Sequence, residues 1–175
     1  MNDEDKLNLF CEKVYTNIVK KNELHSACYL LSFFIYKYCK EVLKIETKII
    51  IGWINDGEWD GVASHAWIEH NEKIIDLSLS ITDNSKPCPT GDAIILDAVI
   101  VKGESVHTYY KSIPELAKEE YEKLKNSPPE ILRLMEHKEK EHKMMFNISQ
   151  QDMLIDNFFK NAPTRAQYKN LTNML

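Results

Sequence analysis

The sequence predicts an α+β domain in which N-terminal helices pack on an antiparallel sheet of about four or more strands, with a helical C-terminal appendage. Three observations lead to this prediction. Apolar residues recur at helical spacing over 3–43, β-branched residues dominate much of 47–102, and helix-start signals return from Ser112 onward. We place the core at residues 1–110 and the helical extension, packed on that core, at 111–175.

The composition is typical of a globular chain with no nucleic-acid or membrane partner. The 175 residues are 43% hydrophobic and 28% charged, which is enough for a core without disulfides or a structural metal. The net charge is −5 with no basic block, which argues against nucleic-acid binding. No apolar run approaches the ~20 residues of a membrane span, and the acidic N-terminus is unlike a signal peptide.

The four cysteines indicate a reducing compartment. They lie at positions 11, 28, 39 and 88, and no Cys-x-x-Cys pair occurs among them. This spacing fits neither a disulfide framework nor a zinc ribbon. We therefore expect a cytoplasmic protein with free thiols, no metal and no cofactor.

Two helices are predicted at the N-terminus. Apolar residues recur at helical spacing over 3–20, and Asn2 or Asp3 can cap the start. A second helix is predicted from about Ser26, as its N-cap, to about Leu43. Because this second segment is apolar almost all round, we expect it to be the central buried helix.

Strands and then further helices follow along the chain. Strands are predicted at about 47–54, 62–69, 73–79 and 93–102, with a turn at 55–57 and a loop at 82–92. In the extension, a capping box at Ser112 and Glu115 predicts a helix start. Proline in the first turn after Ser127 predicts a second start, and Ser149 with Asp152 predicts a third.

Cys28, His65 and Asp76 are the residues best suited to thiol catalysis. A thiol needs a base to become a good nucleophile, and the base needs a third group to hold its ring. Cys28 lies in the first turn of the second predicted helix, where unsatisfied amides and the macrodipole favour a thiolate. An aspartate inside the apolar run around Asp76 needs a partner, since aspartate is rare in strands.

The hairpin between the second and third predicted strands decides whether His65 and Asp76 meet. A two-residue turn at 70–71 places them directly opposite each other. A turn at 71–72 places Asp76 opposite Trp67 and diagonal to His65, still on the same face. A three-residue loop would separate them onto opposite faces of the sheet.

These residues resemble the transglutaminase-like division of the papain-like cysteine enzymes. The resemblance covers about residues 22–80: a cysteine that opens a helix, His-Ala-Trp-Ile-Glu on a strand, and an aspartate on the next strand. Within that division, the chain is most similar to small bacterial peptidases that trim leader segments from lasso-peptide precursors. Arylamine acetyltransferases share the same residue order. The resemblance implies that Cys28 is the nucleophile, His65 the base and then the proton donor, and Asp76 the group that orients the ring.

The resemblance also implies an oxyanion hole and a substrate-binding surface. The backbone N–H of Cys28 would be one oxyanion donor. Papain-like enzymes often take the second from a glutamine several residues before the cysteine, where this chain has no glutamine. The candidates for that second donor are Asn22, Glu23, His25, Trp53 and Trp59. Trp67 is predicted to contact the substrate.

The sequence therefore predicts a cysteine hydrolase that cleaves a peptide or amide bond through a thioester on Cys28. The expected substrate is a peptide or protein. The alternatives on the same triad are an acyltransferase, a transglutaminase or a glutamine deamidase. A non-catalytic peptide-binding or protein-binding module of the same fold is a further alternative. The C-terminal helices offer a surface for a partner protein or for a second copy of the chain.

Two other features compete for a functional role. Cys88 lies between prolines in the predicted loop, but neither a helix start nor a nearby histidine supports its activation. Glu139 and His142 have the spacing of two metal ligands on one helical face. A di-iron site needs this motif twice, and no second well-placed copy exists, so we expect a solvated helix face here.

Overall fold

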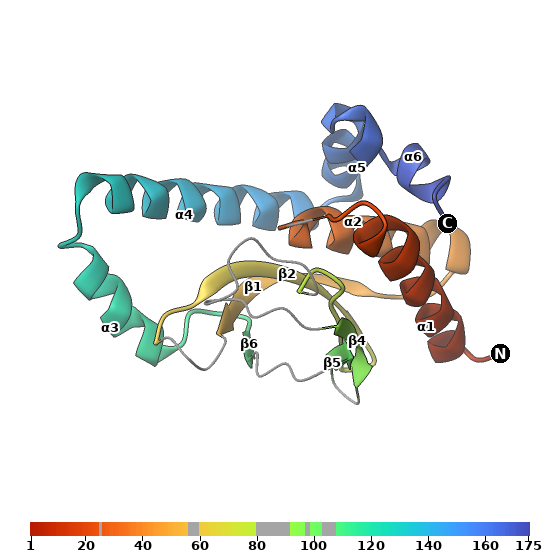
Figure 1. Ribbon diagram of the computed structural model, residues 1–175, viewed down its shortest axis with the longest axis horizontal. Coiled ribbons are helices and arrows are strands. Elements are labelled where there is room, and N and C mark those ends of the chain that lie inside the picture. Colours follow the sequence, from red (N-terminus) through yellow and green to blue (C-terminus); the bar gives the residue numbers. More distant parts are fainter. Residues whose placement is uncertain (25, 56–59, 80–91, 97–98, 103–107) are drawn as a thin grey trace.

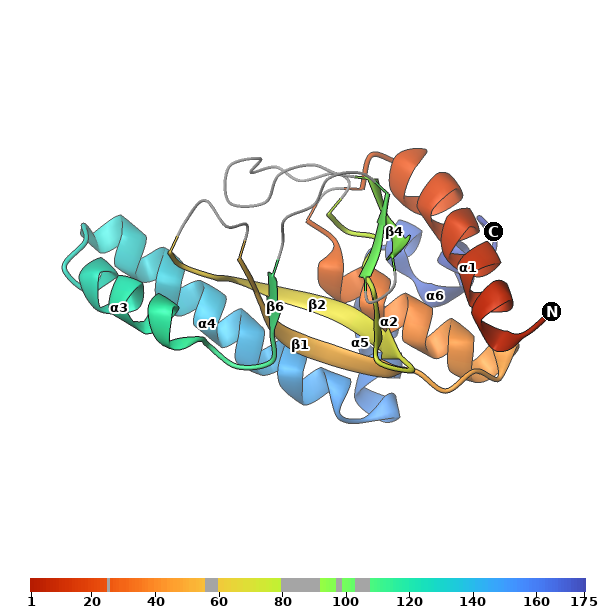
Figure 2. The same cartoon turned by 90° about the horizontal axis from the view of Figure 1, so that it is seen from below.

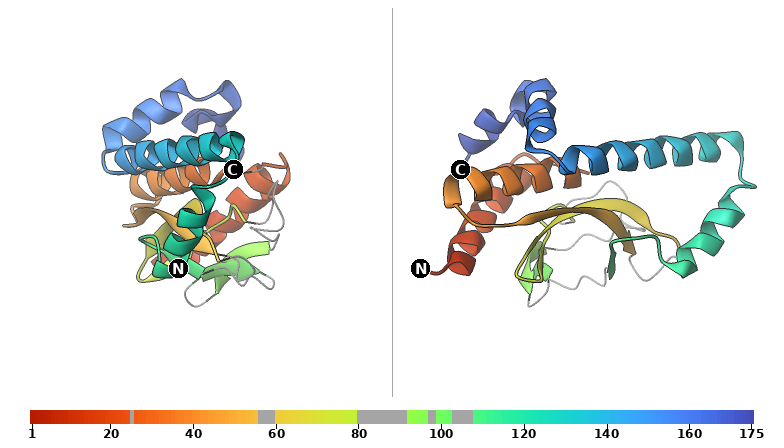
Figure 3. Two further views of the ribbon diagram at one scale, coloured as in Figure 1. Left: turned by 90° about the vertical axis from the view of Figure 1, so that its left-hand side faces the viewer. Right: turned by 180° about the vertical axis from the view of Figure 1, so that it is seen from behind.

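The computed structural model describes residues 1–24, 26–55, 60–79, 92–96, 99–102 and 108–175. The fold is α+β, as predicted. Helices cover one face of a curled sheet, and the last C-terminal helices lie on the outer side of that helical layer (Figure 1 and Figure 3). One long helix extends along the sheet and past its end, so the molecule is elongated in this direction.

Within the described residues, the sheet has six strands in the order β4-β5-β3-β2-β1-β6. They are β1 (Lys48–Asn55), β2 (Ala63–His70), β3 (Lys73–Ile75), β4 (Asp92–Leu96), β5 (Val99–Lys102) and β6 (Thr108–Tyr110). Figure 2 shows the long strands β1 and β2 side by side. All neighbouring strands are antiparallel except β3 and β5, which pair in parallel at Ile74 and Val99. The long pair β1–β2 forms the centre and carries β6 on one side and β3 on the other.

Two strand predictions need correction, and one strand was not predicted. The strand predicted at 73–79 ends at Ile75. The next residue, Asp76, does not continue the strand pairing, and its side chain accepts hydrogen bonds instead. The single strand predicted at 93–102 is the antiparallel pair β4 and β5, with Leu96 opposite Val99. A continuous apolar run has no periodicity that distinguishes one strand from two. β6 was not predicted. The predicted loop at 82–92 lies, except for Asp92, outside the described residues.

The two N-terminal helices each end in a wider, π-helical turn. They are α1 (Asp3–Val14) followed by η1 (Tyr15–Lys20), and α2 (Cys28–Tyr38) followed by η2 (Cys39–Leu43). Asn2 caps α1 through a reciprocal capping box with Asp5. The predicted cap of the second helix is wrong: Ala27 is the N-cap of α2, and Ser26 has a left-handed φ of 47°. Cys28 is therefore the first helical residue.

The C-terminal extension is helical from Glu115. It contains α3 (Glu115–Leu124), α4 (Pro129–Ser149), α5 (Asp152–Asn161), the short 3₁₀ helix η3 (Thr164–Ala166) and α6 (Tyr168–Thr172). Pro129 occupies the first turn of α4, as predicted. The predicted caps at Ser112 and Ser149 are wrong. Pro114 precedes α3, and Gln151 precedes α5, whereas the Ser149 hydroxyl donates to the Phe146 carbonyl inside α4.

One hydrophobic core joins the N-terminal helices, the sheet and the C-terminal helices. Ile155, Phe159 and Leu171 from α5 and α6 belong to the same buried cluster as α1, α2 and the helix-facing residues of the strands. Phe158 packs edge-on against Phe33 of α2 at a ring distance of 4.9 Å. The division of the chain at residue 110 stays a prediction. Among the described helices, none is long and apolar enough to cross a membrane.

Candidate active site

A tight hairpin brings Asp76 to His65. Asn71 and Glu72 form its two-residue turn, and both have positive φ, 47° and 65°, as a type I′ turn requires. His70 pairs with Lys73, so the hairpin adopts the second of the two predicted registers. Asp76 follows directly after β3 and shares a sheet face with His65.

The two side chains form a buried pair. The His65 Nε2 lies 2.5 Å from Asp76 Oδ2, and the residues are only 5% and 2% exposed. Three further hydrogen bonds hold the carboxylate. The Ser78 backbone N–H and hydroxyl donate to Oδ1 at 2.9 Å and 2.7 Å, and the Tyr109 hydroxyl donates to Oδ2 at 2.9 Å. With both oxygens bonded, the carboxylate has a fixed orientation toward the imidazole.

Cys28, the first residue of α2, interacts with the same ring. On β2, the partners of β3 are Ile68–His70. The start of α2 contacts β2 beyond that pairing, where the Tyr29 hydroxyl lies 2.7 Å from Ser64 Oγ. There Cys28 lies close enough to His65 that its charge and hydrogen bonding raise the pKa of the imidazole. Because Asp76 occupies Nε2, Nδ1 is the ring atom left to exchange a proton with the thiol. Cys28 is half-buried, so a reagent or substrate can reach it from solvent.

The electrostatics favour a protonated His65 and an ionised Asp76. Burial alone would lower the pKa of His65, but the negative charges of Asp76 and Cys28 outweigh it, and the pKa is raised well above its ordinary value. Burial would likewise raise the pKa of Asp76. The charge and hydrogen bond of His65, together with the Ser78 donors, lower it instead. Because its pKa is raised, His65 binds a proton strongly and is suited to act as the base.

Aromatic residues fix the position of the His65 ring. Trp67 stacks beside His65 with the ring planes 21° apart, and Tyr109 packs edge-on against Trp67 at 5.1 Å. Trp67, predicted to contact substrate, is 1% exposed, and its indole N–H donates to Glu69. Gly52 lies opposite His65 in β1, where a β-carbon would come within 2.5 Å of the Trp67 ring. The packing of Trp67 against β1 thus requires glycine at this position.

The three predicted oxyanion donors that the structure describes, Asn22, Glu23 and Trp53, do not gather at Cys28. The Asn22 side-chain amide donates to the carbonyls of Asn17 and Ile18 at the end of η1, and Glu23 is an exposed carboxylate with no donor to offer. Trp53 lies opposite Ser64 in β1, on the sheet face away from His65. His25 and Trp59 lie outside the described residues.

The backbone at the start of α2 remains the oxyanion donor with structural support. Ala27 has no side chain that could bond the first-turn amides, and no side-chain cap is formed. These N–H groups carry the positive end of the helix dipole, where Cys28 lies. The helix start is thus suited to stabilise negative charge beside the thiol.

The competing features that the structure describes make contacts of their own. Cys11 and Cys39 are buried, which raises the pKa of both thiols, that of Cys39 to about 12. Cys88 lies outside the described residues. Glu139 binds Lys143 along α4, whereas His142 contacts Ser64. Among the described residues, no group of three or more His, Cys, Asp or Glu side chains could hold a metal ion.

Three residues of the site were missed by the sequence analysis: Gly52, Ser78 and Tyr109. The Asp-Leu-Ser order at 76–78 carried a usable signal, because aspartate commonly accepts a hydrogen bond from the backbone two residues later. Tyr109 offered no such signal. It reaches Asp76 only because β6 pairs with β1, more than fifty residues earlier in the chain.

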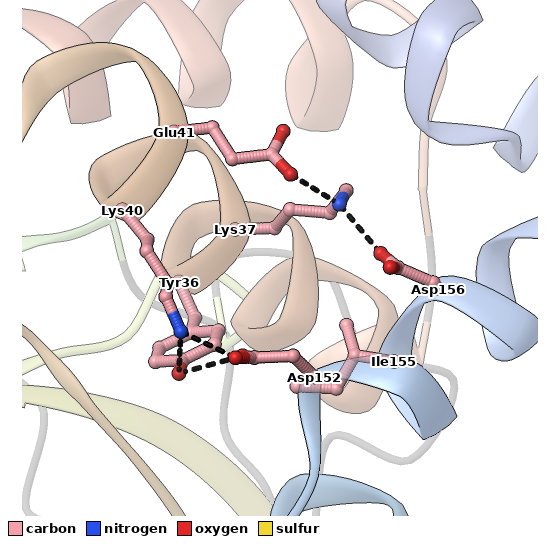
Figure 4. A pocket seen from close by; sticks show the side chains of 7 residues that line it. All are labelled: Tyr36, Lys37, Lys40, Glu41, Asp152, Ile155 and Asp156. Carbon is pink, nitrogen blue, oxygen red and sulfur yellow. Dashed lines mark hydrogen bonds and ion pairs between the residues drawn. The ribbon is translucent and has the colours of Figure 1, made fainter.

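A second charged cluster lies at the opposite end of α2 (Figure 4). It lines a small pocket of about 110 Å³ between α2, η2 and α5. Lys37 binds Glu41 and Asp156, and Lys40 binds Asp152, which also accepts the Tyr36 hydroxyl. These contacts are mostly exposed and attach α5 to α2. They involve none of the predicted site residues.

Comparison of the chain with protein-family models, curated proteins and solved structures finds no match. The family assignment therefore stays a prediction from residues 22–80. What the chain can do chemically follows from the contacts of Cys28, His65 and Asp76.

Proposed function

We propose that this protein is a cysteine hydrolase that cleaves a peptide or amide bond through a thioester on Cys28. The observation that supports this function is the buried His65, which is held by Asp76 and interacts with Cys28. A nucleophile, a base and an orienting group in that order are the components of triad catalysis. The half-buried thiol provides the point of access.

The first half-reaction transfers the acyl group to sulfur. The Cys28 proton passes to His65, and the thiolate adds to the substrate carbonyl carbon to form a tetrahedral oxyanion. The first-turn amides of α2 stabilise that charge. The carbon–nitrogen bond then breaks, and His65 gives its proton to the leaving amine. A thioester on Cys28 and a free amine result.

The second half-reaction hydrolyses the thioester. His65, now neutral, takes a proton from water as the water oxygen adds to the thioester carbon. The carbon–sulfur bond breaks, the acid is released, and the proton returns to the Cys28 thiolate. Throughout, Asp76 keeps the imidazole oriented and stabilises its charged form. This cycle requires a reduced thiol, in line with the expected cytoplasmic location.

The test is incubation with a peptide library, with the products identified by mass spectrometry. We expect cleaved peptides from the wild type and none from Cys28→Ala or His65→Ala. In water labelled with heavy oxygen, the new carboxyl group should carry the label. If an added amine replaces the label in the product, the acyltransferase alternative is correct. If no product depends on Cys28, the chain is not a hydrolase of peptides or amides.

A further inference from the structure

A chain of three hydrogen-bonding side chains connects α4 to both halves of the candidate active site. The Tyr29 hydroxyl lies 2.7 Å from Ser64 Oγ, and Ser64 Oγ lies 2.6 Å from His142 Nδ1. Tyr29 directly follows Cys28, and Ser64 directly precedes His65. The Tyr29–Ser64–His142 chain therefore joins the neighbours of the nucleophile and of the base.

Aromatic packing fixes the orientation of His142. Its ring stacks on Trp53 at 4.3 Å with the planes 19° apart, and Trp53 lies opposite Ser64 in the β1–β2 ladder. Tyr121 of α3 packs edge-on against the same indole and donates to the Val62 carbonyl. None of the 21 residues of α4 is fully buried. Met145 and Ile148 pack partly buried against the core, and the polar and aromatic contact of His142 attaches the preceding turn of the helix to β1 and β2.

The direction of the hydrogen bonds in this chain is set by the tautomer of His142: with the ring proton on Nε2, Nδ1 accepts from Ser64. Burial, with a smaller effect of Lys143, lowers the pKa of His142, so its ring is neutral near neutral pH and Nδ1 can accept. Ser64 has a single proton. When Ser64 donates it to Nδ1, the Tyr29 hydroxyl must donate to Ser64 Oγ. Loss of the acceptor at position 142 would therefore free the Ser64 hydroxyl to rotate and weaken the contact with Tyr29.

We propose that His142 is a positioning residue for the Cys28–His65 pair, acting through Ser64 and Tyr29. This inference rests on the proposed function. The start of α2 lacks a side-chain cap, so the usual local device that fixes a helix start is missing beside the nucleophile. The Tyr29–Ser64 bond holds it against β2 instead. Because a displacement of about 1 Å can cost on the order of 10²-fold in rate, this attachment matters for catalysis.

The test compares substitutions at position 142 by the rate at which iodoacetamide alkylates Cys28. His142→Phe keeps an aromatic ring for Trp53 but removes the acceptor, whereas His142→Asn keeps an acceptor near the position of Nδ1. We expect alkylation to slow by about tenfold or more in His142→Phe and to recover to within about threefold in His142→Asn. Asp156→Ala, which loosens α5 at the other end of α2, should leave the rate unchanged.

Ser64→Ala and Tyr29→Phe break the Tyr29–Ser64–His142 chain at its other two members. They replace His142→Phe in the alkylation test if that variant does not fold. A wild-type rate in His142→Phe, or equal slowing by the phenylalanine and the asparagine, would overturn the inference while the proposed function stands. If the wild type itself shows no preferred alkylation at Cys28, the proposed function and the positioning role fall together. The melting temperature of each variant separates loss of stability from loss of reactivity.

Discussion

An ion pair lies beside each end of α2, but the surroundings of the two pairs are very different. At its start, His65 and Asp76 are almost fully buried and only 2.5 Å apart. At its far end, Lys37 and Asp156 are equally close, but the Asp156 side chain is 57% exposed. Water screens the second pair, so it contributes little, whereas the first pair cannot lose one partner without leaving a buried charge. Burial, more than the presence of opposite charges, therefore marks the candidate active site.

The largest expected effect comes from breaking the buried pair. Asp76→Ala removes the carboxylate and leaves His65 Nε2 with its longer, 3.4 Å contact to the Ser78 hydroxyl. We expect a loss of about 3–5 kcal/mol in the free energy of unfolding, measured by urea denaturation at neutral pH. Selective alkylation of Cys28 should also disappear. A loss below about 1 kcal/mol would mean that the pair is not desolvated in solution.

The pH dependence of this loss follows from the direction of the two pKa shifts. Because the pKa of His65 is raised, its contribution to the free energy of unfolding is complete below about pH 6.5. That contribution is lost as the pH rises through the raised value. Because the pKa of Asp76 is lowered, its contribution is complete above about pH 3.9 and is lost as the pH falls through the lowered value. Urea denaturation of wild type and Asp76→Ala across pH should show the largest difference between these limits. A difference that grows steadily with pH would contradict the assignment.

An intermediate effect is expected from Gly52→Ala. The added β-carbon would lie 2.5 Å from both the Trp67 ring and the Tyr110 carbonyl, and the indole that packs beside His65 must move. We expect a loss of about 1–3 kcal/mol in unfolding free energy and a changed tryptophan fluorescence spectrum. Wild-type stability in this variant would show that Trp67 has free space in solution.

A smaller effect is expected from Tyr109→Phe. The substitution removes one of the hydrogen bonds to Asp76 and keeps the aromatic packing on Trp67. We expect a loss of about 1–1.5 kcal/mol in urea denaturation, because the donors from His65 and Ser78 remain. No loss at all would mean that β6 does not hold the carboxylate.

The smallest effect is expected at the exposed end of α2. Asp156→Ala removes one ion pair of Lys37, whose contact with Glu41 remains. We expect a change of at most about 1 kcal/mol in unfolding free energy, further reduced in high salt, and no change in Cys28 alkylation. A loss as large as that of Asp76→Ala would remove the distinction between the two ends of α2.

The parts of this molecule that were predictable depend on local sequence. The shared sheet face of His65 and Asp76 was predictable, because a two-residue turn at either 70–71 or 71–72 produces it. The choice between these two registers was left open by the sequence, and the structure adopts the turn at 71–72. The contacts of Tyr109 and His142 were not predictable, since each depends on how distant elements pack on the sheet. The cap of α2 was mispredicted because the chain takes a left-handed turn at Ser26, which sequence propensity does not require.

The most direct measurement of the central claim is a mass-spectrometric map of iodoacetamide alkylation in the native protein near neutral pH, for wild type and His65→Ala. Cys11 and Cys39 are buried and serve as internal references, and Cys88→Ser controls for the remaining thiol. If His65 activates Cys28, the wild type is alkylated selectively at Cys28, and His65→Ala slows that reaction. Equal labelling of all cysteines, no labelling of Cys28, or a rate that His65→Ala leaves unchanged would contradict the claim.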